Sequence, residues 1–198
     1  MTTKILVIGS NSFSGSHFVF HALEKGFRVI GVSRSKNLNK IFLPYKWKNS
    51  KYNLKNNNLE NFSFLQVDLN KDEDQNNLIN LIDFEKPSYI FNFAAQGMVA
   101  ESWLNPMHWY KTNLLSQVKL HDQLRKRKFI LKYIHITTPE VYGSTNDQWL
   151  SEDTSFSPST PYAVSRAACD LHLKTFLNAY DFPVIFTRAA NVYGAGQK

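Results

Sequence analysis

Two side chains one helical turn apart form the most reactive pair in this chain. Tyr162 is followed four positions later by Arg166, in a segment with helical spacing. Residues four apart share a helix face, and a cation on that face lowers the pKa of a tyrosine from its usual value of about 10. The hydroxyl of Thr138 and the carboxylate of Glu140 come earlier, where a strand is expected to end. These groups have the chemistry to move a proton and a hydride at a carbinol carbon.

A glycine turn near the N-terminus predicts a phosphate-binding loop. Gly9 and Gly15 bracket a short polar segment that joins a predicted strand at residues 5–8 to a predicted helix at 14–25. Such a turn lets a pyrophosphate approach the backbone and the helix N-terminus. Ser12 stands where the pattern usually has its middle glycine. An ordinary strand-to-helix turn therefore explains the segment about as well when it is taken alone.

The second and third strands end in residues that suit an adenosine phosphate. Ser33 and Arg34 follow the second strand, where NAD sites commonly carry an acidic residue for the ribose 2′-hydroxyl. A serine and an arginine suit a 2′-phosphate instead, which favours NADP over NAD; a solvated loop arginine is the alternative. Asp68 and Leu69 follow the third strand. Asp68 is interpreted either as a receiver of the adenine amino group or as an ordinary turn residue.

Strands and helices alternate along the whole chain. Strands are predicted at residues 5–8, 28–32, 62–67, 89–93, 133–137 and 183–188, and helices at 14–25, around 78–82, at 106–127 and at 161–180. This order predicts an α/β fold, a Rossmann-like doubly wound parallel sheet. One NAD(P)-binding domain is expected over residues 1–198, with a polar Lys/Asn-rich insertion at 36–61. The carboxyl ends of the strands, where such sheets bind ligands, are predicted at Gly9, Ser33, Asp68, Ala94, Thr138 and Ala189.

The composition limits which partners and which cellular compartment are expected. The chain has 198 residues, 43% of them hydrophobic, and a single cysteine, Cys169, which fits a reducing cytoplasm. The six histidines show no ligand spacing with the cysteine or with carboxylates, so no metal site is predicted. No segment is long and apolar enough for a secretory leader or a membrane span. A cytoplasmic protein with no membrane partner is expected.

The net charge of +7 comes partly from two basic clusters. Six lysines lie between residues 36 and 55 among aromatic residues, and a second cluster occupies residues 125–128. Basic residues interleaved with aromatics can mark a nucleic-acid surface. No nucleic-acid motif accompanies them, so we interpret them as a solvated loop and a basic helix end, with no nucleic-acid partner.

Taken together, these motifs resemble the extended short-chain dehydrogenase/reductases that act on nucleotide sugars. The resemblance covers nearly the whole chain, and its specificity lies in the order and combination of the motifs. They are the glycine turn, Asp68-Leu69, Asn92-Phe-Ala-Ala-Gln96, Thr112-Asn113, Thr138-Pro-Glu140-Val-Tyr-Gly143, Pro161-Tyr162 with Arg166, and Arg188-Ala-Ala-Asn191-Val-Tyr-Gly194.

The resemblance implies a role for each matched residue. Tyr162 would take the proton of the sugar 4-hydroxyl and Thr138 would hydrogen-bond the 4-oxygen. Arg166 stands where the family has lysine, and would bind the nicotinamide ribose and keep Tyr162 ionised. Gln96 and Asn191 would contact the substrate. The remaining cofactor-binding residues, around the adenosine, the pyrophosphate and the cofactor channel, would be Gly9, Ser12, Phe13, Ser14, Gly15, Ser33, Arg34, Asp68, Leu69, Ala94 and Ala95.

Glu140 distinguishes the branches of this family. Sugar-nucleotide 4,6-dehydratases have a glutamate here that removes the C5 proton, whereas simple 4-epimerases generally lack it and UDP-glucuronate decarboxylases keep a similar one. Pro139 replaces the acidic residue of the dTDP-glucose branch, and the GDP-mannose branch uses NADP. A 4,6-dehydratase is therefore expected, with an epimerase or a decarboxylase as alternatives. A catalytically weak nucleotide-binding protein is the alternative from another class.

The resemblance also bears on the size of the protein. Family members carry a C-terminal sugar-binding part after a segment like the one that ends at Gly194. This substrate domain is expected to be absent from the chain, so turnover of sugars by the chain alone is not expected. A homodimer is expected for a full-length form.

Overall fold

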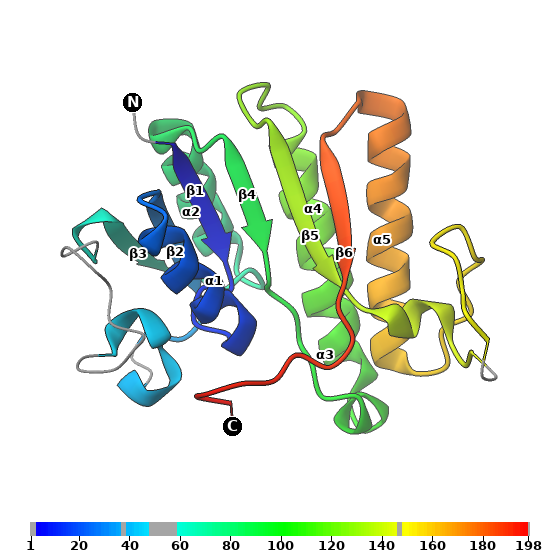
Figure 1. Cartoon of the computed structure of the whole chain (residues 1–198). Coiled ribbons are helices and arrows are strands. Elements are labelled where there is room, and N and C mark those ends of the chain that lie inside the picture. The colour runs from blue at the N-terminus through cyan, green and yellow to red at the C-terminus, as the bar shows by residue number, and fades with distance from the viewer. Residues whose placement is uncertain (1–2, 37–38, 48–58, 146–147, 198) are drawn as a thin grey trace.

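The computed structural model describes residues 3–36, 39–47, 59–145 and 148–197. Six strands form one parallel sheet in the order β3-β2-β1-β4-β5-β6. This is the strand order of a dinucleotide-binding fold, and it confirms the predicted Rossmann-like architecture (Figure 1). The strands are β1 (Lys4–Ile8), β2 (Arg28–Ser33), β3 (Phe62–Gln66), β4 (Tyr89–Asn92), β5 (Lys132–Thr137) and β6 (Val184–Arg188).

Helices connect the strands and cover the sheet. The α-helices are α1 (Phe13–Glu24), α2 (Asp72–Glu85), α3 (Pro106–Tyr110), α4 (Ser116–Leu124) and α5 (Pro161–Tyr180). Short 3-10 turns are η1 (Lys40–Phe42), η2 (Pro44–Lys46), η4 (Ala100–Trp103) and η6 (Pro139–Tyr142), and η5 (Lys111–Leu115) is a π-helical segment. The single helix predicted at 106–127 is thus divided, because η5 interrupts it between α3 and α4.

The core has two parts because the strands β1 and β2 bury side chains on both faces. Leu6 and Ile30 pack with α2, α4 and α5 on one face. Val7 and Val29 pack with α1 and the turn η2 on the other. Period-two alternation sends neighbouring residues to opposite faces, so a continuous apolar run such as Ile5–Ile8 is what a doubly covered strand requires.

The described part of the predicted insertion is more structured than its composition suggested. Leu43 and Tyr45, at and beside η2, are buried against α1. The hydroxyl of Tyr45 donates a hydrogen bond of 3.0 Å to Oδ1 of Asn11 in the glycine turn. Residues 37–38 and 48–58 of the insertion lie outside the described residues.

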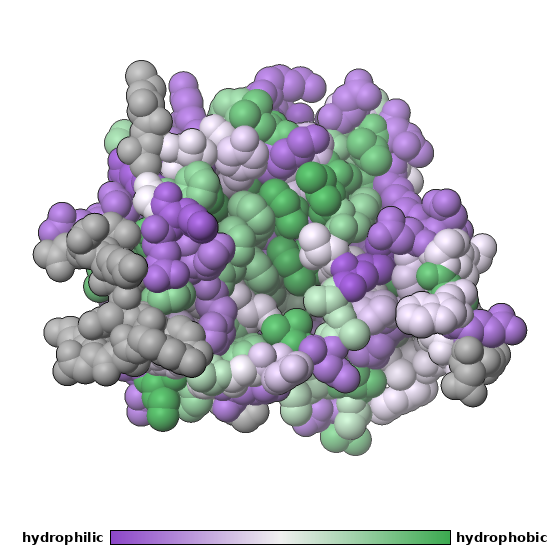
Figure 2. Space-filling model, viewed as in Figure 1, coloured by the Kyte–Doolittle hydropathy of each residue, from purple (hydrophilic) through white to green (hydrophobic). Residues whose placement is uncertain are grey.

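Strands β5 and β6 are covered on one face only, as far as the described residues go. Tyr133 and His135 of β5 point into the core under α4 and α5. Ile134, between them, points to the opposite face, and Ile185 of β6 is 43% exposed. Figure 2 shows hydrophobic side chains gathered in the middle of this face. We call this surface, formed by β5 and β6 on the side opposite α4 and α5, the open face.

Candidate cofactor and active site

A cavity of about 230 Å³ opens at the carboxyl edge of the sheet, where β1 and β4 lie side by side. From β1 the sheet continues through β2 to β3, and from β4 it continues the other way through β5 to β6. Folds of this kind bind ligands in the crevice between the two strands at which the order reverses. Nine residues predicted as ligand contacts line this cavity. They are Gly9, Ser12, Ser33, Arg34, Asp68, Leu69, Ala94, Ala95 and Gln96.

The glycine turn closes tightly around two glycines. Gly9 has a φ of +85°, and a Cβ there would lie 2.8 Å from the backbone nitrogen of Ala94. A Cβ on Gly15 would collide with the carbonyl oxygen of Gly9. Both positions therefore require glycine so that β1, α1 and the loop after β4 can approach one another.

Ser12 occupies the place of the usual middle glycine and closes the turn itself. Its hydroxyl donates to the carbonyl of Gly9 at 2.7 Å and accepts from the backbone nitrogen of Gly15 at 3.1 Å, which caps α1. Phe13 and Ser14 form the first turn of this helix, where backbone N–H groups lack intrahelical partners. A helix N-terminus beside a glycine turn is chemically suited to a pyrophosphate, so the residues present fit a dinucleotide.

The end of β2 is held by a residue that the sequence did not single out. The backbone nitrogen of Asn11 donates to Oγ of Ser33 at 2.9 Å, and its side-chain nitrogen donates to the carbonyl of Ser35 at 2.6 Å. These bonds tie the glycine turn to the end of β2. Arg34 is exposed and lines the cavity, so its guanidinium is available to an anionic ligand.

The surroundings of Asp68 are compatible with both interpretations made from the sequence, an adenine contact and a turn residue. It lines the cavity, as an adenine contact would. Its Oδ1 also accepts from the backbone nitrogen of Asn70 at 3.0 Å, which is the pattern of a turn aspartate.

Thr138 and Glu140 lie just beyond β5, at the same edge of the sheet. Thr138 is buried and is the N-cap of η6, where its hydroxyl accepts from the backbone nitrogen of Glu140 at 3.3 Å. Partial burial raises the pKa of the Glu140 carboxyl above its usual value. The turn η6 packs against α5, whose first turn carries Tyr162.

Arg166 lies one turn further along α5 and does not line the cavity. It is 2% exposed, and its Nη2 donates to the carbonyl of Ile136 in β5. Its Nε and Nη1 have no hydrogen-bond partner among the described residues. The predicted roles of Arg166 towards a ribose and towards Tyr162 stay predictions.

A sequence profile described as "GDP-mannose 4,6 dehydratase" matches residues 6–198. The chain belongs to the NAD-dependent epimerase/dehydratase family of short-chain dehydrogenase/reductases. Human dTDP-D-glucose 4,6-dehydratase is 29% identical over 98% of this chain and 52% of its own length. The chain therefore spans about half the length of this curated relative.

Two solved structures of the family share the fold. DesIV, a dTDP-glucose 4,6-dehydratase from Streptomyces venezuelae solved with NAD, has a TM-score of 0.83 at 25% identity, over 98% of this chain and 58% of that one. The UDP-N-acetylglucosamine 4-epimerase from Methanobrevibacter ruminantium M1 has a TM-score of 0.81 at 25% identity, over 100% of this chain and 58% of that one. Both reactions therefore occur among the structural neighbours.

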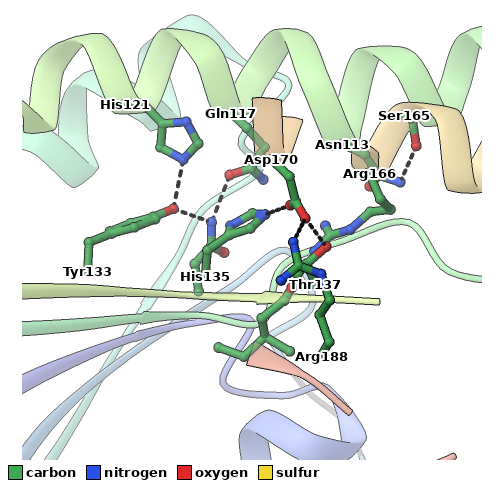
Figure 3. A network of polar contacts seen from close by, with 12 residues as sticks. Asn113, Gln117, His121, Tyr133, His135, Thr137, Ser165, Arg166, Asp170 and Arg188 are labelled. Carbon is green, nitrogen blue, oxygen red and sulfur yellow. Dashed lines mark hydrogen bonds and ion pairs between the residues drawn. The ribbon is translucent and has the colours of Figure 1, made fainter. Parts of the chain in front are cut away.

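Asn113, in the Thr-Asn motif of the family resemblance, proves to connect the cavity to α5. Its Oδ1 accepts from the backbone nitrogen of Gln96 at 2.7 Å, and its Nδ2 donates to the carbonyl of Gln96 at 3.0 Å. The same Nδ2 donates to Oγ of Ser165, also at 3.0 Å (Figure 3). It lies in the π-helical segment η5, and such segments are frequent at functional sites. Sequence reasoning gave it no role, because helical spacing does not reveal a π-turn.

The last described segment returns across the carboxyl edge of the sheet towards α1 (Figure 1). The carbonyl of Ala195 lies 2.9 Å from Nε2 of His17, and Gly194 lies against the ring of Phe13. Asn191, predicted to contact substrate, is exposed on this segment and does not line the cavity. Its role towards a sugar stays a prediction.

The second basic cluster is partly neutralised within the fold. Arg125 and Lys126 form ion pairs with Asp122, and Arg127 pairs with Asp83. This agrees with the interpretation of a basic helix end. Among the described residues, no helix has the length and apolar character needed to cross a membrane.

Proposed function

We propose that this chain is the cofactor-binding and catalytic part of a nucleotide-sugar 4,6-dehydratase. The observation that supports it most is the placement of Thr138 and Glu140 on one short segment packed against the helix whose first turn carries Tyr162. A hydroxyl, a carboxylate and a phenol thereby come to the same edge of the sheet as the cavity. Glu140 favours dehydration because it provides a base for the C5 proton.

The cofactor that we propose is a nicotinamide dinucleotide, with NADP preferred over NAD. The glycine turn and the first turn of α1 would hold the pyrophosphate. Arg34 lines the cavity and no carboxylate follows β2, which supports a 2′-phosphate as its partner. When bound, this group supplies the hydride acceptor and returns the hydride.

The chain's own residues would accept and donate the protons of the reaction. Tyr162 takes the proton of the sugar 4-hydroxyl while the hydroxyl of Thr138 hydrogen-bonds the 4-oxygen. The resulting ketone acidifies C5, and Glu140 removes the proton there. Its neighbour Pro139 has no acidic proton, so Glu140 is the group on η6 that returns a proton to the hydroxyl leaving C6 as water. Once C6 has received the hydride and C5 has received a proton, which balances the proton that Tyr162 took from the 4-hydroxyl, the net loss is one water and the product is a 4-keto-6-deoxy sugar nucleotide.

The substitution Glu140→Gln, made in the complete protein, tests the proposal. C4 oxidation should persist, exchange of the C5 proton with deuterated solvent should stop, and turnover should fall by roughly 10²–10⁴-fold. Glu73→Gln, at an exposed position in α2, is the matched control and should exchange like the wild type. Normal C5 exchange in Glu140→Gln would remove this residue from the role of base.

Two further reactions are distinguished by product mass. A 4-epimerase, the activity of one structural neighbour, leaves the mass of a nucleotide hexose unchanged, whereas a dehydratase removes one water. A UDP-glucuronate decarboxylase releases carbon dioxide. Mass spectrometry of full-length protein incubated with nucleotide hexoses and UDP-glucuronate separates the three.

A nucleotide-binding protein with little catalysis is favoured by one observation, the burial of Arg166 against β5. If that cation does not reach Tyr162, the phenol lacks its activating partner. Nucleotide binding by calorimetry, without turnover of any nucleotide sugar by the complete protein, would support this alternative.

We also propose that the complete protein pairs with a second copy of itself. The segment from η4 to α3 exposes Trp103, Leu104 and Met107, with exposed fractions of 62% or more. Such clustered apolar side chains mark interaction surfaces. Leu104→Glu should shift sedimentation towards a monomer, whereas Phe84→Glu, on the exposed side of α2, should not. Unchanged sedimentation of Leu104→Glu would exclude this surface.

A further inference from the structure

Three metal-binding side chains meet in the core, away from the cofactor cavity. His121 comes from α4, His135 from β5 and Cys169 from α5, and all three are fully buried. One nitrogen of each imidazole and the sulfur of Cys169 lie within 4.8 Å of one another. The sequence prediction of no metal site rested on spacing along the chain, which cannot reveal a cluster assembled by three separate elements.

Each imidazole has one nitrogen near an oxygen, but three of the four ring nitrogens have no hydrogen-bond partner in the described part of the chain. Nε2 of His121 lies 2.8 Å from the hydroxyl of Tyr133, and Nε2 of His135 lies 3.4 Å from Oδ1 of Asp170 (Figure 3). Nδ1 of each ring is buried without a hydrogen-bond partner in the described part of the chain. Buried polar atoms are rarely left unpaired, so three such nitrogens in one cluster need an explanation.

This arrangement is the one found around metal-bound histidines. A ligating imidazole usually engages a carboxylate or another oxygen through its second nitrogen, which orients the ring towards the ion. Tyr133 is itself fixed, because its hydroxyl accepts from Nδ2 of Asn92 at 2.6 Å. An oxygen therefore lies near Nε2 of both rings, while Nδ1 of each ring has no partner among the described residues.

We propose that His121, His135 and Cys169 bind a soft, closed-shell metal ion that joins α4, β5 and α5. One thiolate and two imidazoles are the ligands that Zn²⁺ and Cu⁺ favour. The ion would have a structural role, since all three side chains are fully buried and none of them lines the cavity. Binding would replace the thiol proton by a sulfur–metal bond and release that proton to solvent.

The protonation states around the cluster agree with this proposal. Burial lowers the pKa of His121 and His135, so their rings are neutral and can donate a lone pair. Burial raises the pKa of Cys169 to about 12, so the thiol keeps its proton until a metal displaces it.

The surrounding charges favour a monovalent ion. Arg166, which faces the cluster from α5, lowers the pKa of both histidines electrostatically and opposes added positive charge. Asp170 is fully buried beside His135 and pairs with Arg188 at 2.9 Å, so its charge is already matched. Cu⁺ together with one thiolate adds no net charge, whereas Zn²⁺ with one thiolate adds +1. Cu⁺ should therefore bind more tightly than Zn²⁺.

The single cysteine makes a direct test possible. Untagged, metal-free chain is titrated with Co²⁺ as a spectroscopic probe, with Zn²⁺ in competition, and with Cu⁺ under reducing, oxygen-free conditions. Any thiolate-to-metal absorption band must then come from Cys169. Because the cluster is closed to solvent, each ion is added both to folded protein and during refolding from urea. One ion per chain and release of one proton are expected.

Two variants and one control complete the test. Cys169→Ala should lose the band, and Tyr133→Phe, which keeps all three ligands but loses the oxygen partner of His121, should bind about 10–100-fold more weakly. His21→Ala, at an exposed position in α1, should bind like the wild type. If Cys169→Ala does not fold, the weaker binding expected of Tyr133→Phe and the expected stoichiometry of one ion per wild-type chain still test the proposal. The proposal fails if folded wild type binds neither Cu⁺ nor Zn²⁺, or if Tyr133→Phe binds as tightly as the wild type.

Discussion

The buried histidines should make the fold sensitive to mild acid. His121 and His135 are fully buried, and burial lowers the pKa of both below the usual 6.5; Arg166 adds to the effect for both rings, and Asp170 opposes it at His135. The native state therefore keeps these rings neutral while the unfolded chain protonates them. Stability is complete above about pH 6.5 and is lost as the pH falls from there towards the lowered native values.

The size of the effect follows from proton linkage. A histidine that is neutral in the native state but has a pKa of about 6.5 when unfolded lowers the free energy of unfolding by about 1.4 kcal/mol between pH 7.5 and pH 5.5. Two such rings give about 2.7 kcal/mol, an upper limit because Asp170 partly restores the pKa of His135. His172 is only partly buried and adds less. A loss of this size is a substantial part of the ~5–15 kcal/mol that stabilises an ordinary domain.

Urea unfolding followed by circular dichroism between pH 7.5 and pH 5.5, with a chelator present, measures this loss. His121→Gln should be less stable at neutral pH but should lose only about half as much free energy over the same pH range. His21→Gln, at an exposed position, should match the wild type throughout. Equal pH dependence in His121→Gln and the wild type would show that the buried ring is not the source, and the reasoning would be wrong.

Substitutions at three further positions test separate parts of the structure. Gly9→Ala should lower the free energy of unfolding by about 1–3 kcal/mol, because alanine is strained at a φ of +85° and its Cβ meets Ala94; thermal melts measure this. Arg34→Ala should weaken NADP but not NAD in calorimetry, and equal wild-type affinities would refute the preference. Arg166→Met should keep or raise the stability measured in urea, since it removes a buried cation with two unpaired nitrogens. The same substitution should abolish C4 oxidation by the complete protein, whereas Arg166→Lys should keep that activity.

The spacing of hydrophobic residues and the residues typical of helix ends were sufficient to predict most of the fold from the sequence. The helix Pro161–Tyr180 has the predicted bounds, because Thr160 caps its start and Asp181 ends it in the left-handed region. The predicted helix at 106–127 was wrong in its interior and at its end. Asn113 bonds the loop at Gln96 from within a π-turn, and that long-range contact leaves no local pattern.

The site was predictable where backbone placement decides it and not where side chains meet in the core. The strand ends brought the cavity residues together because parallel strands finish at one edge. The direction taken by the Arg166 side chain and the meeting of His121 with His135 depend on tertiary packing. Composition also concealed Leu43 and Tyr45, which lie in a polar stretch but are buried.

The open face divides the sheet into two halves that should exchange their amide hydrogens at different rates. Strands β1 and β2 lie between two packed layers, so solvent reaches their amides only in large openings of the structure. Within the described residues, strand β6 lies at the edge of the sheet and pairs only with β5, and its Ile185 is exposed on the open face. Its hydrogen bonds can open with little loss of packing, so deuterium should enter β6 first, β5 next and β1 last.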